Sequence, residues 1–147
     1  MIQKPYSRET KAVNSGMLRN VFNAWTVFDF TQGEAVAFGV QTEKELETLH
    51  EMGLPGDMLY MVQGDTKVII GSKDREDRVA YIEDVTSFRH IDDSTLAQAN
   101  FTDLQLAIEG GIYCIRCRSD GNRALVRILS LGQDAMSFEY RVLESSH

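Results

Sequence analysis

The sequence predicts a mainly β protein, an antiparallel β-sandwich or rolled sheet with one or two short helices. The last third of the chain holds three segments separated by turn residues, at 111–118, 123–131 and 136–143, and the last of them alternates apolar and polar residues strictly. Earlier segments rich in aromatic and β-branched residues also pair around turns. The 147 residues, 43% of them apolar, suffice for one compact domain with its own core.

The N-terminal part is expected to begin without regular structure. Residues 1–20 are polar and mixed in charge, so we expect a weakly ordered lead-in, followed by a single β-rich domain over 21–147. Residues 23–30 and 35–40 flank the turn residues 31–34 and predict a hairpin. Thr42 and Glu45 then form a capping box, which predicts a short amphipathic helix over 43–52 that ends at Gly53.

The middle of the chain predicts further strands and a second helical region. Residues 58–63 and 67–71 flank Gly64 and Asp65 as a strand pair, 72–77 is a charged loop, and 78–83 is another strand. Asp92 offers an N-cap to a segment that is helical by content up to about residue 109. We expect an interruption near Asn100 and a restart capped by Thr102.

The C-terminal segments predict a three-stranded meander. Asp120 and Gly121 are a preferred hairpin pair between the first two strands. In the third strand Met136, Phe138, Tyr140 and Val142 share one face. The middle strand has apolar residues on both faces, so we expect it to be central in the sheet.

Charge and hydropathy exclude several classes of protein. The net charge of −7 and the pI near 4.9 describe an acidic protein and argue against a nucleic-acid partner, which normally meets a basic face. No window approaches the roughly 18 consecutive apolar residues of a membrane span. The polar start of the chain lacks the apolar core of a secretory leader, so as written it predicts a cytoplasmic protein; export would require a leader upstream of Met1.

The two cysteines invite a redox or metal interpretation because they form a C-x-x-C motif. Cys114 and Cys117 lie in a predicted strand, where residues three apart point to opposite faces with Cα atoms about 10 Å apart. That separation exceeds the roughly 7 Å limit for a disulfide. No second pair completes a zinc site. We therefore predict two reduced, structural thiols and no metal site.

No catalytic motif appears, and the sequence predicts a protein that is not an enzyme. A nucleophile elbow, a phosphate loop and an H-E-x-x-H motif are absent. His90 precedes Asp92, a carboxylate that could orient its imidazole, although an exposed histidine explains the same pattern. His50 falls on the predicted helix, at its boundary with the core.

Two further groups of side chains allow both a functional and a structural interpretation. Trp25, Met58 and Met61 are residue types that line apolar ligand cavities and equally fill cores. All five basic residues of the last three strands and their turns are arginines, which suit an anion site, but cross-strand pairing with nearby acids explains the same pattern and is the preferred interpretation. They are Arg116, Arg118, Arg123, Arg127 and Arg141.

Several segments, in order along residues 23–143, resemble the HmuY-like proteins. The resemblance rests on 25–34 (WTVFDFTQGE), on 57–60 and 84–88, and on the meander with its D-G hairpin and its F-x-Y ending at Phe138 and Tyr140. It implies a β-rich bacterial protein that scavenges haem and does no catalysis. In the family, two histidine or methionine side chains hold the haem iron. By residue type alone, the candidates are His90 with His50, Met58 or Met61.

Two hypotheses of function follow. The first is a non-enzymatic small-ligand-binding module for haem or another flat apolar ligand, with His90, His50, Met58, Met61 and Trp25 as candidate residues. The second is a protein-interaction domain that uses a sheet edge or the arginine-bearing face. The ligand, the partner and the oligomeric state stay open at this point.

Overall fold

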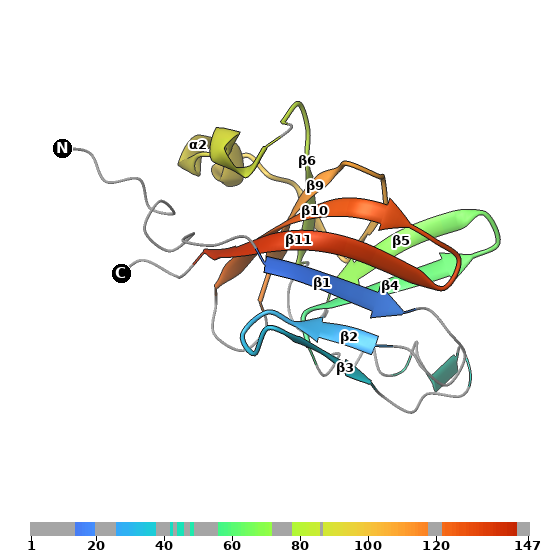
Figure 1. The fold of residues 1–147 in the computed structure, drawn as a ribbon. Helices are drawn as coiled ribbons and strands as arrows, with labels where there is room; N and C mark the ends of the chain where they lie inside the picture. The colour runs from blue at the N-terminus through green and yellow to red at the C-terminus, as the bar shows by residue number, and fades with distance from the viewer. Residues whose placement is uncertain are drawn as a thin grey trace.

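A computed structural model of the chain describes residues 14–19, 26–37, 42, 44–45, 48, 56–71, 78–85, 87–117 and 122–143. These residues form two antiparallel sheets, one of six strands and one of five. The sheets face each other and enclose the main core (Figure 1). The mainly β fold class predicted from the sequence is thereby confirmed.

The six-stranded sheet contains both chain-terminal strands and has the order β1-β11-β10-β9-β6-β7. Its two long strands form because 123–131 carries β-branched and long aliphatic residues on both faces, and 135–143 carries apolar residues at alternating positions. All neighbouring strands in it run antiparallel. The strands are β1 (Asn14–Arg19), β6 (Val79–Ile82), β7 (Phe101–Thr102), β9 (Ile112–Arg116), β10 (Arg123–Leu131) and β11 (Ala135–Leu143).

The five-stranded sheet has the order β3-β2-β4-β5-β8. Gly64 adopts a φ of +62° in the turn between β4 and β5, a conformation that glycine reaches without steric cost. Asp57 fixes β2 beside β4, because its buried carboxylate accepts the Phe30 N–H at 2.8 Å. The strands are β2 (Thr26–Asp29), β3 (Glu34–Ala37), β4 (Met58–Gln63), β5 (Thr66–Gly71) and β8 (Leu104–Leu106).

Aromatic side chains from both sheets fill the space between them. The Phe28 ring lies 5.1 Å from Phe138 and 5.2 Å from Tyr140, in edge-on arrangements that aromatic pairs favour. The Tyr60 hydroxyl donates across the core to the Gly132 carbonyl at 2.7 Å. Burial raises the pKa of Tyr60, so this hydroxyl stays protonated as a donor.

A second, smaller apolar cluster covers the outer face of the six-stranded sheet. Phe88, Ile91 and Leu96 pack there against residues of β6, β9, β10 and β11. They belong to the 3-10 turn η1 (Phe88–His90), to the residue that follows it, and to the helix α2 (Asp93–Ala97). Figure 1 shows α2 beside this sheet, on the side away from β2 and β3. The molecule therefore has a third layer, and α2 lies in it.

Most predicted strands are confirmed. The hairpin of β2 and β3, the pair of β4 and β5, strand β6 and the C-terminal meander all form, and β10 lies between β9 and β11 as expected. The predicted N-cap contact at Thr42 forms, because the Glu45 backbone N–H donates to the Thr42 hydroxyl at 3.1 Å. Most of the predicted helix over 43–52, the charged loop over 72–77 and the Asp120–Gly121 turn lie outside the described residues.

Two predictions about secondary structure need correction. Residues 14–19, expected within a weakly ordered lead-in, form β1, because every one of them pairs with β11. The helix expected up to residue 109 ends at Ala97. Beyond it, Phe101–Thr102 pairs with β6 and Leu104–Leu106 pairs with β5, so sheet partners satisfy the backbone where the local sequence suggested a helix.

Candidate functional site

A cleft of about 510 Å³ opens where α2 approaches the end of β6, and we call it the α2 cleft. Three segments that are separate in the sequence form its walls: the end of β6 with the turn that follows, α2 with the residues after it, and β8. Its lining residues are Tyr81, Ile82, Glu83, Asp84, Ser94, Thr95, Gln98, Ala99, Asn100 and Gln105.

The first wall exists because β6 is longer than its edge neighbour. Strand β7 pairs only with Val79 and Ala80, so Tyr81 and Ile82 continue beyond it at the edge of the sheet. Ile82 is buried in the outer apolar cluster and anchors this end of the strand. Asp84 then turns the chain with a φ of +61°, a left-handed conformation that aspartate tolerates better than most residues.

The second wall is α2, which a local cap holds in place. The Asp92 carboxylate accepts the Thr95 N–H at 2.8 Å and the Thr95 hydroxyl at 2.9 Å. Those hydrogen bonds, first the backbone one and then the side-chain one, lower the pKa of Asp92. Leu96, only 4% exposed, anchors the other side of the helix in the outer cluster. The N-cap predicted at Asp92 is confirmed.

The third wall is Gln105, which reaches the cleft from the five-stranded sheet. Its amide nitrogen donates to the Thr102 hydroxyl at 2.9 Å, and that hydroxyl donates to the Leu104 carbonyl at 2.6 Å. Thr102 therefore orients Gln105 and does not cap a second helix, contrary to the sequence prediction. The carbonyl oxygen of the Gln105 amide stays available as an acceptor.

The polar side chains around the α2 cleft are largely without partners of their own. Within the described residues, no hydrogen bond or ion pair engages the side chains of five of them: Glu83, Asp84, Ser94, Gln98 and Asn100. They offer two carboxylates, two amides and one hydroxyl, and no lysine, arginine or histidine belongs to the described part of the lining. The cleft is thus rich in hydrogen-bonding groups and negatively charged.

The structure does not bring the described candidates for iron ligation together. His90 is exposed on η1, outside the six-stranded sheet. Met58 is fully buried in the core between the sheets. Met61 is half-buried, and because Tyr60 and Val62 face the core, the Met61 side chain points to the other face of its sheet. These three side chains therefore lie in different layers of the molecule.

The remaining candidates have simple outcomes. Trp25 and His50 lie outside the described residues. Cys114 belongs to the outer cluster and Cys117 to the main core, so they lie on opposite faces and form no disulfide with each other, as predicted from the strand geometry. Burial raises the pKa of Cys114 to about 12, which makes it a poor nucleophile at neutral pH.

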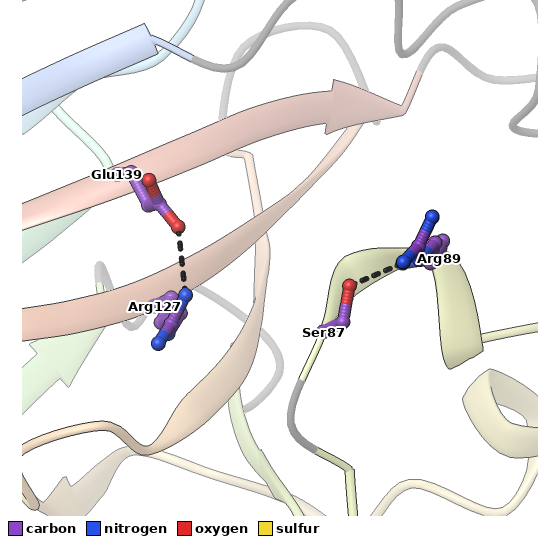
Figure 2. Close-up of polar contacts among 4 residues, drawn as sticks. All are labelled: Ser87, Arg89, Arg127 and Glu139. Carbon is purple, nitrogen blue, oxygen red and sulfur yellow. Dashed lines mark hydrogen bonds and ion pairs between the residues drawn. The ribbon is translucent and has the colours of Figure 1, made fainter.

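Three of the five arginines named above have contacts that the structure defines, and Arg118 lies outside the described residues. Arg127 forms a cross-strand ion pair with Glu139 at 3.3 Å, which Figure 2 shows. Figure 2 also shows a separate hydrogen bond, which the Arg89 backbone N–H donates to the Ser87 hydroxyl. Arg116 lies over the Phe101 ring at 3.8 Å, and Arg141 lies 5.8 Å from the Phe88 ring. Cross-strand pairing thus accounts for Arg127, and aromatic contacts hold two of the others.

Sequence reasoning missed the lining of the α2 cleft. Exposed polar residues such as Gln98, Asn100 and Gln105 follow no periodicity, so nothing marks them as neighbours of Glu83 and Asp84. The one local signal was the cap at Asp92, which predicts where α2 begins but not what it faces.

Comparisons with known proteins support the fold class alone. No family model matches the chain, and no curated protein matches it. The solved structure of a DUF4466 family protein from Parabacteroides merdae ATCC 43184 is similar, with a TM-score of 0.51 and 14% sequence identity. The match covers 89% of this chain but 54% of that one, so the chain spans about half the length of this neighbour. At this identity the likeness shows a shared β-rich fold.

The described residues contain neither a membrane-spanning helix nor a cluster of metal-ligating side chains. No helix among them has the length and hydropathy to cross a membrane. Nowhere in that same part of the chain do three histidine, cysteine, aspartate or glutamate side chains gather in a way that could hold a metal ion.

Proposed function

We propose that the protein is a non-enzymatic module that binds a small polar ligand in the α2 cleft. One observation carries the proposal: five polar side chains without partners among the described residues surround a single cleft of about 510 Å³. Ligand sites typically measure about 300–1,000 Å³ and use a few convergent polar groups to orient the ligand. This volume fits a small molecule, and the polar groups converge from three segments.

The walls of the cleft favour binding because they are fixed before a ligand arrives. Ile82 and Leu96 are both 4% exposed and secure the β6 end and α2 in one apolar cluster. The Asp92 cap holds the first turn of α2. A site that is already formed loses less conformational entropy when it binds, so a modest number of hydrogen bonds gives measurable affinity.

Filling the cleft tests this proposal. Ser94 is exposed on α2 and lines the cleft, so Ser94→Trp places an indole in it without disturbing the core. Small polar fragments of neutral, cationic and anionic character are titrated while backbone amide NMR shifts are followed. We expect at least one fragment to shift the cleft amides of the wild type and to lose that effect in Ser94→Trp.

The matched control is Asp93→Trp, on the same helix but outside the lining. It should bind the fragments like the wild type. The proposal is wrong if no fragment shifts the cleft amides, or if Ser94→Trp and Asp93→Trp respond alike.

Haem binding stays a prediction of the family resemblance. It is tested separately by adding haem and recording the Soret band for the wild type and for His90→Ala. A sharp band that is lost in His90→Ala would support it, and an unchanged spectrum of free haem would reject it.

A second candidate function is recognition of an acidic protein segment by the arginine-bearing face, which we define as Arg116, Arg123 and Arg141. Neither Arg123 nor Arg141 has a carboxylate partner among the described residues. The edge of β8 is less suited to a partner, because the Leu104 and Leu106 carbonyls already accept hydroxyl protons from Thr102 and Tyr113.

Titration with hexaglutamate at low and high salt tests the second candidate. Binding that weakens with salt and in Arg123→Gln would support it. Arg127→Gln is the control, because Arg127 already has Glu139 as its partner. Equal loss in both variants would argue against a specific surface.

A further inference from the structure

We infer that the ligand of the α2 cleft is a neutral polyhydroxylated molecule, such as a short oligosaccharide, an inference that rests on the proposed function. Among the residues that the structure describes, the lining of the cleft holds two carboxylates and no basic side chain. A negatively charged ligand would therefore meet repulsion without a compensating cation. Two classes remain, neutral molecules with many hydrogen-bonding groups and cations.

The chemistry of the cleft favours hydroxyl groups over an ammonium or metal cation. Metal sites in proteins usually bring several charged or imidazole ligands together, and no group of three histidine, cysteine, aspartate or glutamate side chains that could hold a metal ion occurs among the described residues. Cation sites for organic ammonium groups usually combine several aromatic rings, whereas Tyr81 is the one aromatic residue among the described lining residues. Glu83 and Asp84 are exposed, so water and salt would weaken their attraction for a cation.

The side-chain amides of the α2 cleft favour a ligand with hydroxyl groups. A hydroxyl group both donates and accepts a hydrogen bond, and a side-chain amide offers a donor and an acceptor at neighbouring atoms. Gln98 and Asn100 present such amides without partners among the described residues, and Gln105 presents its free carbonyl oxygen. The Glu83 and Asp84 carboxylates add acceptors only. Two adjacent hydroxyls of a sugar ring match this combination of groups.

Tyr81 adds an apolar contact of the kind that sugar rings also use. Tyr81 is half-buried, and its ring centroid lies 5.2 Å from that of Tyr113, so this ring contact holds the side chain in place. An aromatic ring beside polar groups offers a flat surface to the C–H groups of a pyranose while the hydroxyls bind the amides and carboxylates. Ile82 and Ala99 are the other apolar residues in the part of the lining that the structure describes, and two such residues favour a polar ligand over a flat apolar one.

Titration with three probes tests two claims separately: that the α2 cleft binds a ligand, and that this ligand is a neutral polyhydroxylated molecule. Maltotriose, choline and citrate are added separately to the full chain, and amide shifts of Asp84, Gln98, Asn100 and Gln105 are recorded. We expect maltotriose to shift them, with Gln98→Ala combined with Asn100→Ala lowering its affinity about tenfold or more. Gln32→Ala is the control, because Gln32 is an exposed amide in the β2–β3 turn and outside the cleft.

The outcomes separate the two claims. Shifts by choline or citrate without maltotriose would overturn the ligand class and leave the binding site standing. No shift with any of the three probes would overturn the inference, and no shift across the wider fragment panel would overturn the proposed function as well. If Gln32→Ala lowered the affinity for maltotriose as much as the Gln98→Ala and Asn100→Ala double variant did, the amides of the cleft would not be the groups that bind maltotriose.

Discussion

Replacing Gly16 by alanine should destabilise the protein, because β1 packs on the aromatic core without room for a side chain. Gly16 pairs with Phe138 in register. A Cβ atom there would lie 2.5 and 2.8 Å from two atoms of the Phe138 ring and 2.9 Å from the Phe28 ring. Those rings also contact each other at 5.1 Å between centroids, so neither can move without disturbing the other.

The expected magnitude follows from two opposing terms. Overfilling a packed core costs about 1–3 kcal/mol. Replacing glycine by alanine recovers roughly 0.4–1 kcal/mol through the entropy of the unfolded chain. The net loss is about 1–2 kcal/mol. With an unfolding entropy of roughly 2.1 cal/mol/K per residue, 147 residues give about 0.3 kcal/mol/K, so the Tm should fall by about 3–6 °C.

Thermal and urea unfolding measure this loss, and two further variants identify its cause. Ser15→Ala changes the exposed neighbour of Gly16 and should alter the Tm little. In a Phe138→Leu background, the smaller side chain relieves the overlap, so Gly16→Ala should cost less than it does in the wild type. If Gly16→Ala is as stable as Ser15→Ala, or if its cost is unchanged beside Phe138→Leu, the packing of β1 on the core is wrong.

Three further predictions concern a thiol, a helix cap and an ion pair. The pKa of Cys114 rises from 9.0 in the unfolded chain to about 12 in the folded protein, so the folded state binds more protons between these two pH values. The free energy of unfolding, measured with urea, should therefore fall as the pH rises above about 9, and it should fall less steeply in Cys114→Ala. A steeper fall in Cys114→Ala would contradict the burial of this thiol. Asp92→Ala should speed hydrogen exchange of the α2 amides while Asp92→Asn preserves the cap, and equal exchange in both variants would count against it. Glu139→Gln should change the free energy of unfolding by less than about 0.5 kcal/mol, because its ion pair with Arg127 is solvated (Arg127 is 42% and Glu139 28% exposed). A loss several times larger in urea unfolding would show that the pair is buried in solution.

The sequence predicted strands wherever alternation was strong and the turn was local. Strands β4 and β5 flank Gly64, and β11 alternates residue by residue, so their pairing follows from neighbouring positions. Strand β1 could not be predicted this way. It contributes Leu18 to the core, but its other inward position is Gly16, whose fit depends on a ring supplied by the far end of the chain.

The helical segment expected up to residue 109 failed for a related reason. Leu104, Gln105 and Leu106 alternate, but over three residues that pattern is too short to distinguish a strand from a helix. The partner β5 decides the outcome by pairing with all three. Local content predicted where α2 begins, and contacts distant in sequence determined where it ends.

The candidate site was less accessible to sequence reasoning than the fold. Histidine and methionine side chains attract notice by residue type, yet His90 and Met58 lie in different layers of the structure. The α2 cleft instead combines ordinary polar residues such as Gln98 and Asn100 with a turn that follows a different strand. Only the packing of the third layer on the six-stranded sheet brings them together.

A crystal structure of the full chain grown with maltotriose, or with the fragment that gives the largest amide shifts, would locate the ligand. We expect ordered ligand density between the turn at Asp84 and the helix α2, within hydrogen-bond distance of the Gln98 or Asn100 amide. Density in the interior between the two sheets, or beside His90 with the cleft filled only by solvent, would contradict it.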